Sequence, residues 1–422
     1  MRLIWILLPA VLCRAASLGP SASDVDRLYP GIEALYIDIH SNPELAFQEK
    51  QTAAKLAARV KELGYEVKTG VGGTGVVALL KNGAGPVVML RTELDALPVT
   101  EQTGLPFSSK IPGVMHACGH DLHMAAWAGT AQWMAAHRAE WHGTLMLIGQ
   151  PAEEAGAGAS AMLKDGLFVR FPKPDFAIAL HDDDTLPAGV IGYHAGFFRA
   201  AADFPTVTIF GRGGHGAMPQ NTVDPIVIAA RTILDWQTIV SRENDPQSPV
   251  VITVGAIHGG TKNNIIPDQV QLLLSVRTFD PLVRKRVLAA IARIAKAEAE
   301  AAGAPREPLI EPTPGMTGDE AVYNDPDLTN RLAEALKKGM PPGNVVEMPA
   351  KMTSEDFSEY GRAGAKAALL HIGAVDPEKL AESRRTGVPV PAPHSPQWAP
   401  VRETTLKAAV QAETLALLNL LN

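Results

Sequence analysis

The spacing of apolar positions between residues 24 and 202 switches between helical and extended periods. Helical spacing covers residues 24–40, 50–63 and 121–138, and Gly64 stands where a helix C-cap is expected. Nearly continuous apolar runs, typical of buried strands, cover residues 75–80, 87–90, 144–148 and 176–180. Helices that alternate with such strands predict an α/β domain built around a mostly parallel sheet.

The order of predicted elements changes from residue 204 onward. Strands are expected at residues 205–210, 250–257, 270–278 and 307–311, with helices at 225–240 and 281–302. This β-α-β-β-α-β order is that of a ferredoxin-like domain. A helix at 328–338, a strand at 367–371 and a last amphipathic helix at 401–421 return the chain to the first domain. We therefore expect one α/β domain, residues 24–202 and 314–422, interrupted by a smaller domain at 203–313, with a site in the crevice between them.

Composition and net charge exclude several classes of protein. The 422 residues are 46% hydrophobic and carry 38 basic against 45 acidic side chains, for a net charge of -7. The composition excludes disorder, and the charge gives no basic surface for nucleic acid or an anionic membrane. We therefore expect a small-molecule partner.

Residues 1–22 have the layout of an export signal. Met1 and Arg2 precede an apolar run that ends at Cys13, and small residues follow. The run is shorter than the about 20 apolar residues that span a bilayer. We expect a periplasmic or secreted protein without a membrane span; the alternative is an N-terminal helix. Cleavage would leave Cys118 as the only thiol, so no disulfide scaffold is expected.

The clearest chemical feature is a cluster around Cys118. His116, His120 and His123 lie within eight residues of the chain, and Cys118 and His120 flank Gly119. Both side chains can converge on one point, and a thiolate with an imidazole is a ligand pair that zinc prefers. Two ligands alone do not make a metal site, so a buried cysteine beside surface histidines is the alternative.

Further metal-ligating side chains come soon after the ends of three predicted strands, namely Asp95, Glu153, Glu154 and His181. The carboxyl ends of parallel strands share one edge of the sheet, where α/β folds bind their ligands. We therefore expect these side chains to meet Cys118 and His120 at that edge. One of the adjacent glutamates can then bind a metal while the other stays free as a base.

A series of short motifs runs along the chain. They are residues 40–49, Asp95-Ala-Leu-Pro98, His116-Ala-Cys-Gly-His-Asp121, Pro151-Ala-Glu-Glu154, Ala179-Leu-His181, Gly213-Gly-His-Gly-Ala-Met-Pro219, residues 259–268, Ser354-Glu-Asp-Phe357 and His394-Ser-Pro396. In these motifs the chain resembles the M20 family of metallopeptidases, and within it the amidohydrolase branch of hippurate hydrolases, N-acyl-amino-acid hydrolases and plant indole-acetyl-amino-acid hydrolases. The resemblance covers essentially the whole chain after the export signal.

The resemblance implies a zinc-peptidase-like catalytic domain with two divalent metal ions, zinc or manganese. The implied ligands are Cys118, His120, Glu154, His181 and His394, with Glu153 as general base. We expect the Asp95 carboxylate to accept the second N–H of His120, with a strand-end capping role as the alternative. A bound metal lowers the pKa of water from about 15.7 to near 7. Glu153 would take the remaining proton and pass it to the departing amine.

The resemblance also assigns a part to the inserted domain. In relatives it is a lid or dimerisation domain, so a homodimer through the lid is expected. His215 matches a histidine that reaches the partner subunit's active site to polarise the substrate carbonyl. Asn264 and Arg277 match lid positions associated with the substrate carboxylate, which suits an arginine fork. For Arg277 a solvated residue or a structural ion pair is the alternative.

One departure from the family pattern follows His181. This chain has Asp182, Asp183 and Asp184 where relatives have an aromatic residue and proline. We expect these carboxylates to be solvated; the alternatives are that they attract an additional cation or disfavour an acidic acyl group, so the departure leaves the choice of substrate open.

Together these observations predict a metal-dependent amidohydrolase that cleaves N-acyl amino acids or short peptides with a free carboxylate. A carboxypeptidase or dipeptidase of the same family is the alternative within this class. A thiol hydrolase with Cys118 as nucleophile and a non-catalytic binding protein that keeps the fold are alternatives from other classes.

Overall fold

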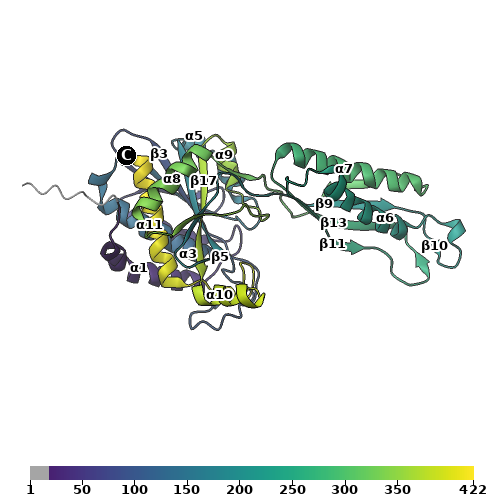
Figure 1. Ribbon diagram of the computed structural model, residues 1–422, viewed down its shortest axis with the longest axis horizontal. Coiled ribbons are helices and arrows are strands. Elements are labelled where there is room, and N and C mark those ends of the chain that lie inside the picture. The colour runs from purple at the N-terminus through teal and green to yellow at the C-terminus, as the bar shows by residue number, and fades with distance from the viewer. Residues whose placement is uncertain (1–18) are drawn as a thin grey trace, which may run out of the picture.

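Two β-sheets at opposite ends of an elongated molecule organise the chain (Figure 1). The computed structural model describes residues 19–422. Most of the expected export signal, Cys13 included, lies outside the described residues. Within residues 19–422, no helix is both long and apolar enough to cross a membrane.

The larger sheet carries the predicted α/β domain. Its strands are β1 (Glu66–Val71), β2 (Gly75–Asn82), β3 (Val87–Glu93), β4 (Gly143–Gln150), β5 (Phe176–Pro187), β6 (Ile191–Tyr193), β16 (Val345–Glu347) and β17 (Lys366–Val375). They lie in the order β1-β2-β4-β3-β5-β17-β6-β16. The pairs β4–β3, β3–β5 and β5–β17 are parallel, which confirms the predicted mostly parallel fold class. The pairs β1–β2 and β2–β4 are antiparallel and form one edge.

Helices cover both faces of the larger sheet. One face carries α1 (Ala22–Ser41), α2 (Lys50–Glu62), α3 (His120–Ala136), α8 (Pro326–Gly339) and α11 (Arg402–Leu421). The other carries α4 (Gly158–Lys164), α5 (Leu167–Arg170) and α9 (Ser358–Arg362), and α10 (Pro377–Thr386) follows β17. Leu90 of β3 packs with Trp127 on the first face, and the neighbouring Met89 packs with Met162 on the second, as strand alternation requires. Because α1 and α11 also contact α3, this helix is buried on nearly every side and gives the residues at its start a rigid support.

The smaller sheet has the predicted ferredoxin-like order. Its elements are β9 (Pro205–Phe210), α6 (Pro225–Thr238), β11 (Val250–His258), β13 (Gln269–Thr278), α7 (Pro281–Ala301) and β14 (Leu309–Pro312). The strands lie in the order β11-β13-β9-β14, and every neighbouring pair is antiparallel. Trp236 of α6 and Ile291 of α7 pack in one core with Val207 and Leu272 of the sheet. The bounds 203–313 stay a prediction, and β8 (Ala201–Asp203) also pairs with β13.

Two pairs of short strands flank the smaller sheet. β10 (Gly214–His215) and β12 (Ile265–Ile266) form a ribbon, and β10 lies at the end of the molecule farthest from the larger sheet (Figure 1). β7 (Gly196–Arg199) pairs with β15 (Val322–Asn324) on the side of the larger sheet.

Two departures from the predicted elements have physical causes. The hydrophobic pattern does not predict β1 because most side chains of this edge strand are exposed. β5 continues to Pro187, beyond the predicted end at Leu180, because Asp182 and Asp183 are buried among partners distant in the sequence.

Candidate metal centre and active-site cleft

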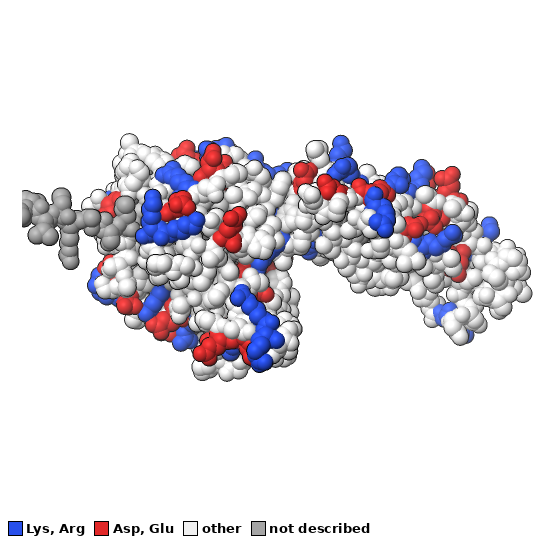
Figure 2. All heavy atoms as spheres, viewed as in Figure 1, with Lys and Arg blue, Asp and Glu red and all other residues white. Residues whose placement is uncertain are grey.

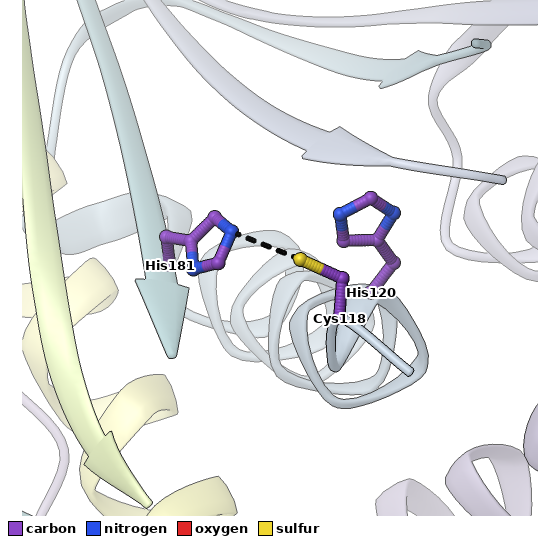
Figure 3. Close-up of side chains that lie close together, drawn as sticks. All are labelled: Cys118, His120 and His181. Carbon is purple, nitrogen blue, oxygen red and sulfur yellow. Dashed lines mark hydrogen bonds between the residues drawn. The ribbon is translucent and has the colours of Figure 1, made fainter. Parts of the chain in front are cut away.

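The start of α3 places Cys118 and His120 beside His181 of β5. Gly119 has a φ of 73°, in the left-handed region that favours glycine, and the helix begins at the next residue. A side chain at this position would collide with the Asp182 carboxylate. Cys118 Sγ lies 3.6 Å from His181 Nε2, and the His120 ring stands next to them (Figure 3). The structure thus brings three of the predicted ligands together.

The loop after β4 brings the two predicted carboxylates to the same place. His120 Nε2 lies 3.7 Å from Glu153 Oε2 and 3.9 Å from Glu154 Oε1. His394, from the segment between α10 and α11, places its Nε2 3.3 Å from Glu154 Oε2. Ala152 and His394 have φ values of 50° and 70°, which are uncommon in residues other than glycine. Both segments therefore take unusual backbone conformations where they reach the site.

The prediction for the Asp95 carboxylate is wrong. His120 Nδ1 lies 2.8 Å from the main-chain carbonyl oxygen of Asp95 and 3.6 Å from its carboxylate. The carboxylate instead accepts the main-chain N–H groups of Glu153 and Glu154, each at 3.0 Å, and so holds the glutamate loop. The capping role left as the alternative describes this carboxylate. The carbonyl still fixes the His120 tautomer, because it accepts a hydrogen bond from Nδ1–H and leaves Nε2 free as a ligand.

The donor atoms at this site fit metal ions. The ligand atoms of Cys118, His120 and His181 lie within 4.8 Å of one another, and so do those of Cys118, Glu154 and His394. Buried His120 Nε2 and Glu154 Oε1 have no hydrogen-bond partner in the described part of the chain. Buried polar atoms without partners are unfavourable, and thiolate, imidazole and carboxylate groups are common ligands of zinc and similar cations. Two ligand sets that share Cys118 suit two adjacent ions.

The alternative of surface histidines around the cysteine is wrong. His116 and His123 are buried, as is His120. His123 Nδ1 lies 3.0 Å from Glu93 Oε2, which places this ring behind the ligands as a structural neighbour.

The two adjacent glutamates differ in their electrostatic environments. Burial and the negative charges of Glu355 and Glu154 raise the pKa of Glu153 well above its usual range. Burial also opposes ionisation of Glu154, but the hydrogen bond from His394 and the charge of His120 outweigh it and lower the pKa of Glu154. Neighbouring carboxyl groups whose pKa values are pushed apart are typical of an acid–base group beside a permanently charged one.

A cleft of about 890 Å³ opens above these residues, between the larger sheet and the near end of the smaller one. Glu153, Glu154 and His394 line one side of the cleft, and Arg277 of β13 lines the other. The Arg277 guanidinium lies 5.3 Å from the centre of the Phe204 ring. The structure therefore brings Arg277 to the same cleft as the ligands.

The other two lid residues lie elsewhere. His215 belongs to β10 at the far end of the smaller sheet and is exposed, and neither it nor Asn264 lines the cleft. The main-chain N–H of Gly216 donates to the carbonyl of Asn264 at 2.9 Å, so the two predicted residues are neighbours on this distal ribbon. Within the described chain, the structure does not bring them to the metal ligands.

The expectation of solvated carboxylates after His181 is wrong for Asp182 and Asp183. Asp182 Oδ2 accepts from Trp398 Nε1 at 3.1 Å, and both carboxylates are buried. Asp183 Oδ2 lies 2.6 Å from His371 Nδ1 and 2.5 Å from Lys351 Nζ. Burial opposes ionisation of Asp183, but these bonds outweigh it and hold its pKa well below the usual range.

The sequence does not predict a buried cluster of ion pairs that lies behind the site. Arg91 of β3 pairs with Glu93, and its Nη2 lies 2.8 Å from Glu355 and 3.0 Å from Asp356. All four side chains are buried. The Ser354-Glu-Asp-Phe357 motif is the available signal, but nothing local in it indicates Arg91 as the partner.

Comparison with known proteins gives this arrangement a family. Residues 89–385 match peptidase family M20/M25/M40, and the chain belongs to this family. Hippurate hydrolase of Campylobacter jejuni is 39% identical over 308 residues, 72% of this chain and 78% of that protein. N-acetyl-L-cysteine deacetylase of Bacillus subtilis is 36% identical over 323 residues, 76% of this chain and 75% of that protein. The crystal structure of the Bacillus subtilis YXEP protein, described as a dinuclear metal binding peptidase of the M20 family, is 30% identical with a TM-score of 0.78, covering 94% of this chain and 99% of its own.

Proposed function

We propose that the chain is a metal-dependent amidohydrolase that cleaves the amide bond of N-acyl amino acids. The observation that carries this proposal is a pair of adjacent glutamates of opposite pKa shift beside two ligand sets that share Cys118. The relatives named hippurate hydrolase and N-acetyl-L-cysteine deacetylase support the substrate class, because hippurate and N-acetylcysteine are both N-acyl amino acids.

The proposed mechanism divides the work among residues of the site. Cys118, His120, Glu154, His181 and His394 would hold two divalent ions, zinc or manganese. Such ions lower the pKa of water from about 15.7 to near 7 and polarise a carbonyl group. Glu153 accepts the proton of the attacking water at its free carboxylate oxygen and returns it to the departing amine. Its raised pKa suits a group that takes a proton and then gives it back.

The cleft wall opposite the ligands would hold the substrate. Arg277 faces the cleft, and its guanidinium can form two parallel hydrogen bonds to the amino-acid carboxylate. The substrate amide would then lie between Arg277 and Glu153.

We also propose a homodimer formed through the smaller domain. β11 is an edge strand, and Figure 2 shows few charged side chains over it, although charges of both signs are interspersed over the rest of that face. Ile226, Val227 and Leu234 of α6 are exposed. Exposed apolar groups beside an open strand edge are typical of an association surface. A partner could then supply His215 and Asn264 to the cleft of the first subunit.

We propose in addition that residues 1–22 direct export of the protein.

The environment of Cys118 does not favour a thiol nucleophile. Burial and the charge of Glu154 raise the pKa of the Cys118 thiol well above its usual range. A reactive cysteine needs the opposite shift, because the thiolate is the nucleophile. The same thiol becomes a good ligand once a cation replaces its proton.

The test is Glu153→Gln in the metal-loaded protein, assayed on N-acyl amino acids and on free-amine dipeptides. We expect the variant to keep its metal content and to lose about 10²- to 10⁴-fold in kcat, because the amide cannot accept a proton. Glu140→Gln, at an exposed glutamate before the start of β4, is the matched control. Full turnover by Glu153→Gln would refute the mechanism, and faster cleavage of dipeptides would favour a dipeptidase.

A further inference from the structure

Two buried arginines near the site have opposite surroundings. Arg91 is surrounded by the carboxylates of Glu93, Glu355 and Asp356. Arg199, at the end of β7, is 6% exposed and lines the cleft. Within residues 19–422 it forms no ion pair with a carboxylate, and its side chain donates hydrogen bonds to His371 and Thr353. Among the described residues, Arg199 is therefore a buried cation with no carboxylate in direct contact.

Neutral groups hold the Arg199 guanidinium in place. Its Nε donates to His371 Nε2 at 3.2 Å, and Nη1 donates to the Thr353 hydroxyl. His371 can accept this bond only with its proton on Nδ1, which faces Asp183 Oδ2 at 2.6 Å. Burial and the charge of Arg199 lower the pKa of His371 to about 3, in agreement with a neutral ring. In the part of the chain that the structure describes, Nη2 has no hydrogen-bond partner.

This cation lies close to the proposed metal ligands. His371 of β17 is in register with His181 of β5, and the two ring centres are 5.8 Å apart. Lys351 lies in the same wall of the cleft and forms a backbone bridge with Arg199. The carboxylates of Asp183 and Asp184 face the Lys351 ammonium, the latter at 3.4 Å, and neither forms an ion pair with Arg199.

We propose that Arg199 binds a second carboxylate of the substrate, so that the preferred N-acyl amino acids carry two negative charges. The proposal rests on the proposed function for the amide and for the first carboxylate. A buried, fixed guanidinium with free N–H groups is unfavourable until an anion pairs with it, and its fork matches a carboxylate. The second carboxylate belongs either to an acidic side chain of the amino acid or to a dicarboxylic acyl group, because both have the same chemistry.

The experiment compares substrates that differ by one charge. N-acetyl-glutamate is paired with N-acetyl-glutamine, and N-succinyl-glycine with its terminal amide, so that shape is nearly constant within each pair. Affinities are measured by calorimetric titration of metal-loaded Glu153→Gln protein, and then with Arg199→Met or Arg199→Lys added. Because the Glu153→Gln protein has almost no turnover, the titration measures the contribution of Arg199 to binding affinity independently of hydrolysis. If the wild-type protein hydrolyses none of the compounds, that result would refute only the proposed function.

We expect the charged member of one pair to bind about 10- to 100-fold more tightly, and the pair that shows this identifies the source of the carboxylate. Arg199→Met should remove the preference while the affinity for the neutral member stays within about twofold, and Arg199→Lys should restore part of it. The inference is overturned if neither pair shows a preference, or if the preference survives in Arg199→Met. Equal weakening of both members in both variants would assign Arg199 a structural role and overturn it as well.

Discussion

The metal ligands and the distal lid ribbon are opposite cases of how a site residue can be placed. Cys118, His120 and His181 are buried, close to one another and supported by the packed helix α3. His215 is exposed on a two-stranded ribbon at the other end of the molecule. One chain therefore brings together Cys118, His120 and His181 of the proposed site, whereas in the proposed homodimer the lid half would come from a second chain. Changes near the ligands should alter both stability and activity, and changes on the ribbon should alter activity alone.

Removal of the metal tests the ligand half and has the largest expected effect. Chelation should abolish nearly all amide hydrolysis and lower the melting temperature, because the metal binds only the folded chain, in which Cys118, His120 and His181 lie together. A metal present at 1,000 times its Kd stabilises the fold by about 4 kcal/mol. Activity assays and thermal denaturation before and after chelation measure both effects, and zinc or manganese should restore them. A protein that keeps its activity after complete chelation would contradict the proposed site.

Arg91→Met tests whether the interior behind the site depends on its ion cluster. Loss of the guanidinium leaves the buried carboxylates of Glu355 and Asp356 uncompensated, which should lower the free energy of unfolding by about 3–5 kcal/mol. Urea denaturation measures this change. Arg362→Met removes an exposed ion pair with Glu359 and should change the free energy by less than about 1 kcal/mol. Equal effects of the two variants on the free energy of unfolding would show that the ion cluster does not stabilise the fold.

His215→Ala tests the lid half and should leave stability unchanged. We expect a loss of roughly 10²-fold in kcat, about 2.7 kcal/mol of barrier, because a donor to the substrate carbonyl is removed. The free energy of unfolding should stay within about 0.5 kcal/mol, because the side chain is exposed. His142→Ala, at an exposed histidine before β4, is the control and should affect neither quantity.

Mixed subunits separate a histidine from the partner from one supplied by the same chain. When Glu153→Gln and His215→Ala chains are co-expressed, half of the mixed sites would combine intact Glu153 with the partner's intact His215. Statistical pairing then gives about a quarter of wild-type activity, although each variant alone is nearly inactive. No recovery in mixed dimers would overturn the proposed role of the partner.

Local patterns predict most of the fold and the part of the site that lies near strand ends. The larger sheet and the ferredoxin-like order follow from apolar runs that are buried in the structure, and Glu153, Glu154 and His181 follow from the ends of such runs. His394 comes only from the family resemblance, because it lies in an irregular segment with no hydrophobic period. The errors at Asp182 and Asp183 have one cause. Their partners, such as Lys351, His371 and Trp398, are distant in the sequence, so the local pattern contains no information about them.

The left-handed turn at Gly119 has a consequence for how the sequence can vary. Two independent restrictions act there: the backbone φ of 73° and the Asp182 carboxylate, which occupies the space of a Cβ atom. Gly64, with a φ of 89°, has the first restriction without the second, since nothing in the described residues lies within 4 Å of its missing Cβ. A saturation library should therefore accept asparagine at position 64 and return only glycine at position 119. The residue between the two ligands would thus be among the least replaceable in the chain, although it has no side chain of its own.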